Sequence, residues 1–341
     1  MNKLRIVHVG CGGISSSWFS ALKDLPDVEV VGVVDLNPAA AGQCAAKHAL
    51  AAAKVGTDLE AMLNQTKPDI VFDCTIPAAH VQVTTTALRH GCHVLGEKPL
   101  SDSMPNARLM LAEAGKAGRI YAVMQNRRYL PNMLALRNFL ASGVIGRITT
   151  AHCDFFLGPH FGGFRDTMEH ALLLEMAIHT FDQARYLTGA DPHTAMAYEW
   201  NPPGSWFKHG ASAMAMFEMS QDIVYSYRGS WCAEGVDTPW ESAWRIIGEK
   251  GTVTWDGAAT FRAQEVTGAE GFFRARTDRE VLYNPEAMPR QGHAGCIDEF
   301  LDAVRTGKVP QTICTDNIKS LAMLYAAIES AAVGKQVKCE L

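Results

Sequence analysis

Three ionisable residues recur at helical spacing in an otherwise apolar stretch of the chain. Glu175 and His179 are four residues apart, and Asp182 follows three residues later. Residues with these separations share one face of an α-helix, and ionisable groups on a helix suited to burial are where shifted pKa values are expected. Because a histidine titrates near pH 6.5 in its ordinary state, His179 can take a proton near neutral pH. The alternative is a hydrogen-bonded core histidine without chemistry.

A second candidate is a lysine that precedes a proline. Pro99 restricts Lys98 to an extended backbone, which holds its side chain at the carboxyl end of a predicted buried strand. Ligands bind at the carboxyl ends of strands in open parallel sheets. An ammonium group there stabilises negative charge that develops on a substrate oxygen. The alternative is that Glu97 and Lys98 form only an exposed turn pair.

A glycine-rich turn near the N-terminus predicts a dinucleotide site. In the stretch VHVGCGGISSSW, Gly10 and Gly12 follow an apolar run and precede a helical segment. Such glycines allow a tight turn and let the backbone approach a pyrophosphate at the helix N-terminus, with Gly13 and Ile14 in the same turn. Ser15 occupies the third glycine position of the usual pattern. By itself, therefore, this segment is equally compatible with a glycine-rich loop that binds no cofactor.

Asp35 strengthens the cofactor interpretation. It ends the second apolar run, 23 residues after Gly12 (35 minus 12), close to the ~20 expected for the acid that binds the ribose hydroxyls. A carboxylate there repels a 2′-phosphate, and Leu36 and Asn37 provide no arginine to hold one. The sequence therefore favours NAD over NADP. The alternative role of Asp35 is to cap the turn before Pro38.

The elements that must position these residues change in kind along the chain. In the N-terminal third, buried strands alternate with helical stretches, which predicts a doubly wound parallel sheet of the Rossmann type. The strands expected there are residues 4–9, 28–35, 70–75, 92–99 and 119–125. We therefore expect an NAD-binding α/β domain at residues 1–122.

The remaining residues, 123–341, are expected to form a second, α+β domain with a largely antiparallel open sheet. An apolar helix at 171–187 precedes strand-like segments of alternating character, and closing helices are expected at 296–305 and 316–332. The segments expected to form strands are TAMAYEW, SAMAMFEM, IVYSYRGSW, WRIIG and GTVTWD. We expect this domain to bind the substrate.

Composition excludes several classes of protein. The 341 residues are 48% hydrophobic and 20% charged, which is typical of a globular enzyme. A formal net charge of −5 without a basic run gives no support for a nucleic-acid or membrane partner. Nine cysteines without a CxxC pair predict no metal site and a reducing compartment. With no signal-peptide core and no apolar run near ~18 residues, we expect a cytoplasmic protein.

Several segments taken together resemble the glucose–fructose oxidoreductase / inositol dehydrogenase (Gfo/Idh/MocA) family. The likeness extends over nearly the whole chain and includes GEKPL at 96–100, NRRYLP at 126–131, LLEMAIHTFDQARYLTG at 173–189 and WRIIGEKGTVTWDG at 244–257. The resemblance implies that Lys98 lies beside nicotinamide and substrate, with Glu97 in the same cofactor segment. It also implies that His179 and an acid four residues before it complete the catalytic group. That acid is Glu175 here, where relatives usually carry Asp.

Further candidates lie in loops and at helix starts. Residues that follow a buried strand are expected to border the cofactor, namely Thr75, Pro77 and His80. Weaker candidates for substrate contacts are Arg165, His170, Asp182 and Trp206. A tryptophan ring in a loop can stack on a sugar face. Each of these residues also has a purely structural alternative in a surface loop, a helix start or local packing.

Together these features predict an NAD(P)-dependent oxidoreductase that acts on CH–OH groups. We expect hydride transfer from a ring hydroxyl of a sugar, sugar derivative or cyclitol to nicotinamide. One alternative is an enzyme that keeps NAD bound and uses transient oxidation for glycoside cleavage or epimerisation. Another is a non-catalytic NAD sensor, which would have no use for the proton acceptor His179. The resemblance also implies a homo-oligomer that forms through the sheet of the second domain.

Overall fold

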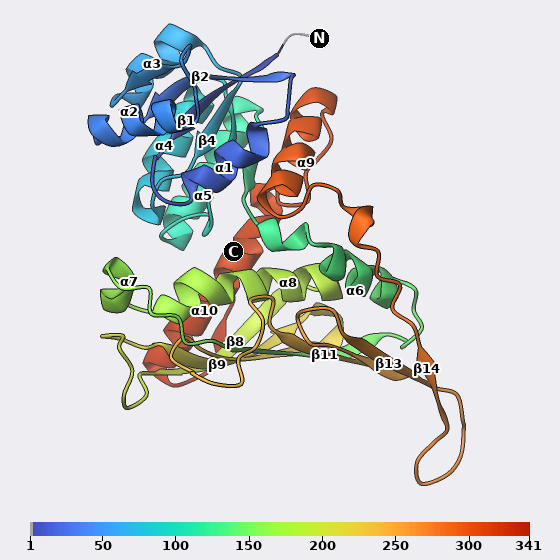
Figure 1. Ribbon diagram of the computed structural model, residues 1–341. Helices are drawn as coiled ribbons and strands as arrows, with labels where there is room; N and C mark the ends of the chain where they lie inside the picture. Colours follow the sequence, from blue (N-terminus) through green and yellow to red (C-terminus); the bar gives the residue numbers. More distant parts are fainter. Residues whose placement is uncertain (1–2) are drawn as a thin grey trace. The chain divides into compact units, whose positions relative to one another are not determined.

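The computed structural model describes residues 3–341 and divides into two compact units (Figure 1). Unit 1 contains the chain up to Tyr129 together with Arg290–Ile318, and unit 2 contains Leu130–Pro289 and Lys319–Leu341. This division differs from the single boundary expected after residue 122. The chain returns to unit 1 because helix α9 (His293–Thr306) buries an apolar stripe there and packs against α1 (Ser15–Leu22).

Unit 1 is built on a parallel sheet of six strands in the order β3-β2-β1-β4-β5-β6. The strands are β1 (Leu4–Val9), β2 (Val28–Val34), β3 (Lys54–Gly56), β4 (Ile70–Asp73), β5 (His93–Gly96) and β6 (Tyr121–Val123). The connecting helices are α1, α2 (Pro38–Lys47), α3 (Leu59–Thr66), α4 (Pro77–Arg89) and α5 (Met104–Ala117). This confirms the predicted Rossmann fold. The strand order reverses between β1 and β4, and such a switch point opens a crevice at the carboxyl ends of the strands.

Unit 2 contains a sheet of nine strands in the order β14-β13-β12-β11-β7-β10-β9-β8-β15. Its strands are β7 (Ile148–Phe156), β8 (Pro192–Trp200), β9 (Ser212–Met219), β10 (Ile223–Ser230), β11 (Ala243–Gly248), β12 (Gly251–Trp255), β13 (Phe261–Val266), β14 (Arg276–Arg279) and β15 (Val337–Lys338). The described pairings are antiparallel except for β7 with β10. This confirms the predicted, largely antiparallel second sheet.

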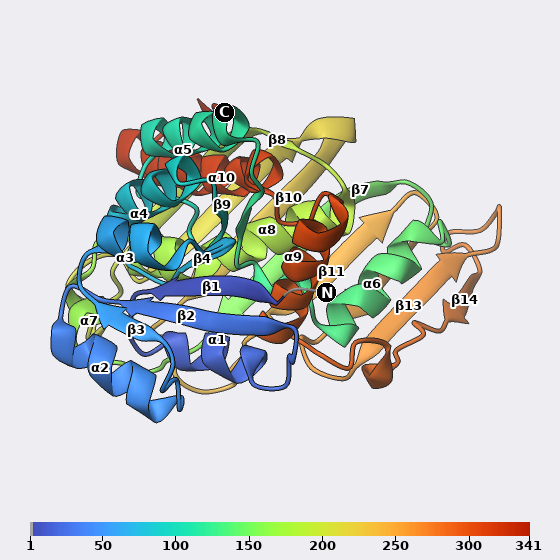
Figure 2. The same cartoon turned by 90° about the horizontal axis from the view of Figure 1, so that it is seen from above.

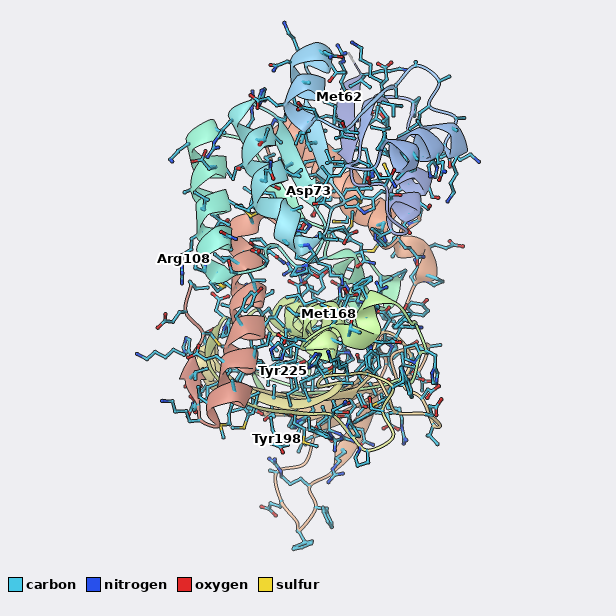
Figure 3. All side chains as sticks on the ribbon, turned by 90° about the vertical axis from the view of Figure 1, so that its left-hand side faces the viewer. Met62, Asp73, Arg108, Met168, Tyr198 and Tyr225 are labelled. Carbon is cyan, nitrogen blue, oxygen red and sulfur yellow. The ribbon has the colours of Figure 1, made fainter. Side chains whose placement is uncertain are left out.

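The two faces of the second sheet differ in what covers them. Helices α6 (Pro131–Ala141) and α8 (Ile178–Thr188) lie on one face, as does the unit-2 part of α10 (Cys314–Val333) (Figures 1 and 2). Tyr225 points into this covered side and is fully buried, whereas Tyr198 lies on the other side and is 67% exposed (Figure 3). The second face is therefore an open sheet surface within the unit.

Short helical segments complete the structure. They are the 3₁₀ turns Asn126–Arg128, Ser220–Asp222 and Pro285–Ala287, helix α7 (Phe164–Thr167), and a π-helical turn at Leu173–Ala177 that leads directly into α8. Among residues 3–341 we find no helix with both the length and the apolar character needed to cross a membrane.

Candidate active site

A cavity of about 680 Å³ lies at the carboxyl ends of β1, β2 and β4 in unit 1. Its lining includes four of the predicted cofactor residues, Gly10, Gly12, Asp35 and Thr75. The structure also brings to it Leu36, which the sequence analysis considered only as a position without an arginine, and residues that were not singled out, among them Asp58, Glu60, Ile76 and Val83. They come from the segments after β2, β3 and β4, and their sequence positions alone gave no signal for this convergence.

The glycine turn requires its first glycine. Gly10 has a φ of +93°, and a Cβ atom there would lie 2.6 Å from the carbonyl oxygen of Cys74. A Cβ at Gly12 or Gly13 would meet no other described atom within 4 Å beyond the neighbouring residues, so this backbone is open to a ligand. Ser15 fits the third position because it is buried and donates a hydrogen bond to the Gly12 carbonyl over 2.6 Å.

A buried histidine contacts the backbone of this turn. One ring nitrogen of His8, Nε2, lies 2.9 Å from the carbonyl oxygen of Gly10. Burial lowers the pKa of His8 to about 4, so the ring is neutral at pH 7 and adds no charge beside the turn. The sequence gave no reason to select this residue, because a histidine in an apolar strand has no recognisable pattern.

Asp35 connects the glycine turn to the end of β2. Its Oδ2 accepts a hydrogen bond from the backbone N–H of Cys11 over 2.8 Å, and its Oδ1 accepts one from Asn37, also over 2.8 Å. Asp35 therefore does cap the following turn, yet each carboxylate oxygen keeps a lone pair for a ribose hydroxyl. Asp58 and Glu60 add acidic groups to the same cavity. This cluster of acids disfavours a 2′-phosphate.

Glu97 faces the interior of unit 1. Its side chain is buried, with Oε1 accepting a hydrogen bond from the Trp18 indole over 2.7 Å and Oε2 accepting one from the Lys98 backbone N–H over 3.1 Å. Burial alone would raise the pKa of Glu97, but the His293 ring, whose Nε2 lies 3.7 Å from Oε1, the hydrogen bond from Trp18 and the charge of Lys98 lower it. Glu97 thus fixes the backbone of the lysine segment rather than projecting into the cavity.

The loop after β4 is organised by an acid that the sequence analysis missed. Asp73 is fully buried (Figure 3) and its Oδ1 accepts hydrogen bonds from the Thr75 N–H and hydroxyl over 3.2 and 2.5 Å. Pro77 is the first residue of α4, and His80 is buried in the next turn of that helix. The only available signal for Asp73 was an acidic residue that ends an apolar strand.

In unit 2 the predicted catalytic helix contains a feature that its sequence did not indicate. Glu175 lies inside the π-helical turn Leu173–Ala177, and His179 follows in the first turn of α8. A π turn is wider than an α turn, so the α-helical relation assumed from their four-residue spacing does not hold. Single π turns are frequent at functional sites. His179 is 8% exposed, which makes it a largely desolvated histidine.

Asp182 has a structural contact on the same helix. Its Oδ1 accepts a hydrogen bond from the hydroxyl of Ser320 over 2.8 Å, and that hydroxyl also accepts one from Arg185 over 3.1 Å. Ser320 belongs to α10, so this network joins α8 to α10. Because Asp182 is 1% exposed, the structure favours support over direct contact with a substrate.

The structure brings Arg165 and Glu175 together. Both Nε and Nη2 of Arg165 lie 3.3 Å from Oε2 of Glu175. The guanidinium also lies over the rings of Phe161 and Phe164, at 5.2 and 4.7 Å. An aspartate at position 175 would be one methylene shorter. The longer side chain therefore gives this chain an ion pair that anchors α7 to the π turn.

The other two candidate substrate residues have partners in neighbouring loops. His170, with a φ of +52°, places Nδ1 2.5 Å from Oε2 of Glu199, and this hydrogen bond raises the pKa of His170. Trp206 stacks on His160 with ring centroids 3.8 Å apart, and His160 contacts Glu234. One face of the Trp206 ring is therefore covered by protein instead of being open to a sugar.

Comparisons with known proteins identify the family. Residues 4–125 match the oxidoreductase family with an NAD-binding Rossmann fold, and residues 133–254 match the GFO/IDH/MocA C-terminal domain. The chain belongs to the Gfo/Idh/MocA family. As a member it is an oxidoreductase whose cofactor is NAD, and the cavity, the open backbone at Gly12 and the carboxylate of Asp35 fit that dinucleotide.

Curated relatives of this Gfo/Idh/MocA protein include named sugar enzymes. The chain is 33% identical to D-glucoside 3-dehydrogenase of Escherichia coli K12 over 54% of each chain. It is 23% identical to 1,5-anhydro-D-fructose reductase of Ensifer adhaerens over 97% of each chain. An oxidoreductase from Agrobacterium radiobacter, solved with NAD+, L-tartaric acid and magnesium, shares the fold with a TM-score of 0.87 at 21% identity, over 99% of each chain. Within residues 3–341 we find no group of three or more His, Cys, Asp and Glu side chains arranged to hold a metal ion.

Proposed function

We propose that this Gfo/Idh/MocA protein is an NAD-dependent dehydrogenase that oxidises a ring hydroxyl of a sugar, sugar derivative or cyclitol. The observation that carries the proposal is the position of Lys98. It directly follows Gly96 and Glu97 at the end of β5, and the neighbouring strand β4 leads into Thr75 of the cofactor cavity. An ammonium group at this edge of the sheet suits a reaction that develops negative charge on a substrate oxygen.

The roles of the side chains follow from the chemistry of alcohol oxidation. Bound NAD+ supplies the hydride acceptor. We assign to Lys98 a hydrogen bond from Nζ to the reacting oxygen and to a ring nitrogen of His179 the acceptance of the hydroxyl proton. Glu175 keeps the π turn and Arg165 in place through its ion pair. The names of the two sugar-specific relatives support a sugar or related polyol as the substrate.

The direct test is absorbance at 340 nm after the purified protein is mixed with sugars, sugar acids, glycosides and inositols. We expect absorbance to rise with one polyol class, and faster with NAD+ than with NADP+, because Asp35 and its acidic neighbours disfavour a 2′-phosphate. A faster rise with NADP+ would contradict the role of Asp35. No rise with any compound, in protein shown to bind NAD, would favour redox cycling on tightly bound NAD or a sensor.

We further propose that copies associate through the open face of the second sheet. That face exposes large apolar side chains on neighbouring strands, namely Met196, Tyr198, Met214, Met216 and Val224. Exposed apolar patches of this kind mark association surfaces. Light scattering is expected to give the mass of an oligomer for the native protein and a lower mass for Tyr198→Glu.

The matched control for this test is Val309→Glu. Val309 is 75% exposed and lies in unit 1, so the same added charge should leave the mass unchanged. A native protein with the mass of a single chain would overturn the proposed association.

A further inference from the structure

We infer that His80 is a positioning residue that fastens the cofactor loop after β4 to the segment that carries Lys98. This role rests on the proposed dehydrogenase function, because it concerns how the reacting groups are held. His80 was expected to border the cofactor. Its side chain is instead 1% exposed within unit 1 and does not line the cofactor cavity.

The two ring nitrogens of His80 meet two different backbone segments. Nε2 lies 3.0 Å from the carbonyl oxygen of Thr75, and Nδ1 lies 3.1 Å from the carbonyl oxygen of Pro99. Both partners are acceptors, so the two contacts are hydrogen bonds at the same time only when both ring nitrogens carry a proton, and the link that we infer requires this doubly protonated ring. A single side chain thus connects a residue of the cofactor cavity with the residue that follows Lys98.

Each end of this connection is held by further buried groups. On the cofactor side, Asp73 accepts hydrogen bonds from the N–H and hydroxyl of Thr75. On the lysine side, Glu97 accepts a hydrogen bond from the Lys98 N–H, and Tyr121 donates one to the Leu100 carbonyl over 3.1 Å. These groups each stabilise one segment, whereas His80 contacts both.

With both ring nitrogens donating, the two segments cannot shift independently. Displacement of the Thr75 carbonyl when the cofactor enters would break a buried hydrogen bond unless the imidazole, and with it the Pro99 carbonyl, moved too. Breaking such a bond in a buried site is costly because the remaining group has no water to replace its partner. The backbone that carries Lys98 is therefore set by the same side chain that sets the cofactor loop, which preorganises the site.

Two substitutions separate the two contacts. In His80→Asn the side-chain amide nitrogen falls near the position of Nδ1, so the Pro99 contact is kept and the Thr75 contact is lost. In His80→Gln the amide nitrogen falls near Nε2, so the Thr75 contact is kept and the Pro99 contact is lost. We expect His80→Asn to raise the Kd for NAD about tenfold with little change in kcat, and His80→Gln to lower kcat about tenfold with little change in that Kd.

Amide hydrogen exchange provides a readout that does not depend on turnover. His80→Asn should speed exchange in the peptide around Thr75, and His80→Gln should speed it in the peptide from Lys98 to Ser101. His90→Asn is the control, because His90 is an exposed residue at the C-terminal end of the same helix. His90→Asn should leave the exchange rates of both peptides, the Kd for NAD and the kcat unchanged.

In the expected result, each variant changes a different peptide and a different constant. A general loss of stability cannot produce this pattern, because it would affect both peptides and both constants in each variant. If both variants change both peptides and both constants in parallel, or if neither changes anything, the linking role of His80 is wrong. If none of the polyols leads the native protein to reduce NAD+, the proposed function fails. The exchange pattern and the Kd for NAD then still decide whether His80 joins the two segments.

Discussion

The variant Lys98→Ala is expected to lose about 100- to 1,000-fold in kcat while its Kd for NAD changes little. The ammonium group is assigned to the reacting oxygen, and removing one donor of this kind typically costs that much. The backbone of the segment should stay in place, because Glu97 and His80 hold it through the Lys98 N–H and the Pro99 carbonyl. Steady-state rates at 340 nm and a fluorescence titration with NAD measure the two quantities separately.

Lys116→Ala is the control for this experiment. Lys116 lies on α5 in unit 1, its side chain is 73% exposed, and it forms an ion pair with Glu113. Its removal changes the net charge by the same amount without touching the β5 segment. Native turnover in Lys98→Ala would remove the main support for the proposed reaction, and loss of NAD binding in that variant would move Lys98 from the reaction to the cofactor.

The second large effect is expected for His179→Asn. Asparagine keeps a polar group of similar size but cannot accept the hydroxyl proton, so kcat should fall about 100- to 10,000-fold. The native pH–rate profile should have an acidic limb that levels off where the acceptor loses its proton, and this levelling-off should disappear with His179. The remaining rate should rise steadily with pH, because hydroxide from solvent is then the available acceptor. Rate profiles of both proteins between pH 5 and about pH 10 are the measurement.

His193→Asn is the matched control in unit 2. His193 is exposed on β8, and the backbone pairing of its carbonyl with Cys339 does not involve the side chain. This variant should keep both kcat and the acidic limb. A His179→Asn protein whose acidic limb still levels off would assign proton acceptance to another group, even if its kcat were lower.

The strands of unit 1 were predictable because burial on both faces leaves a direct mark on sequence. Residues 4–9, 28–34 and 70–73 are nearly continuous apolar runs, and each forms a strand. Strand β3 (Lys54–Gly56) has three residues, one of them charged, and carries no such mark.

In unit 2, β7 was missed although it lies at the centre of the sheet. In its sequence ITTAHCDFF the alternation is confined to the second half, where Ala151, Cys153 and Phe155 are buried, whereas Ile148–Thr150 are all half-buried.

Some residues of the candidate site could be selected from local sequence patterns, whereas others depend on contacts between distant parts of the chain. Local patterns were enough to select Gly10, Asp35 and Lys98, because each is defined by its position after a strand. The hydrogen bond from Trp18 to Glu97 joins residues that are 79 positions apart, and no local pattern reports it. The π turn at Glu175 was also hidden, because helix periodicity in a sequence does not show where one extra residue is accommodated in a turn.

The return of α9 to unit 1 has a consequence for biosynthesis. Phe300 of α9 packs near Phe72 of β4, with ring centroids 6.3 Å apart, and Ile313 pairs with Ala122 of β6. A nascent chain that has emerged only as far as Tyr129 already contains the whole Rossmann sheet but lacks these partners. The surface that awaits α9 then stays exposed on the ribosome until residues 290–318 emerge. Chaperone recognition and premature aggregation should concentrate on that interval of translation.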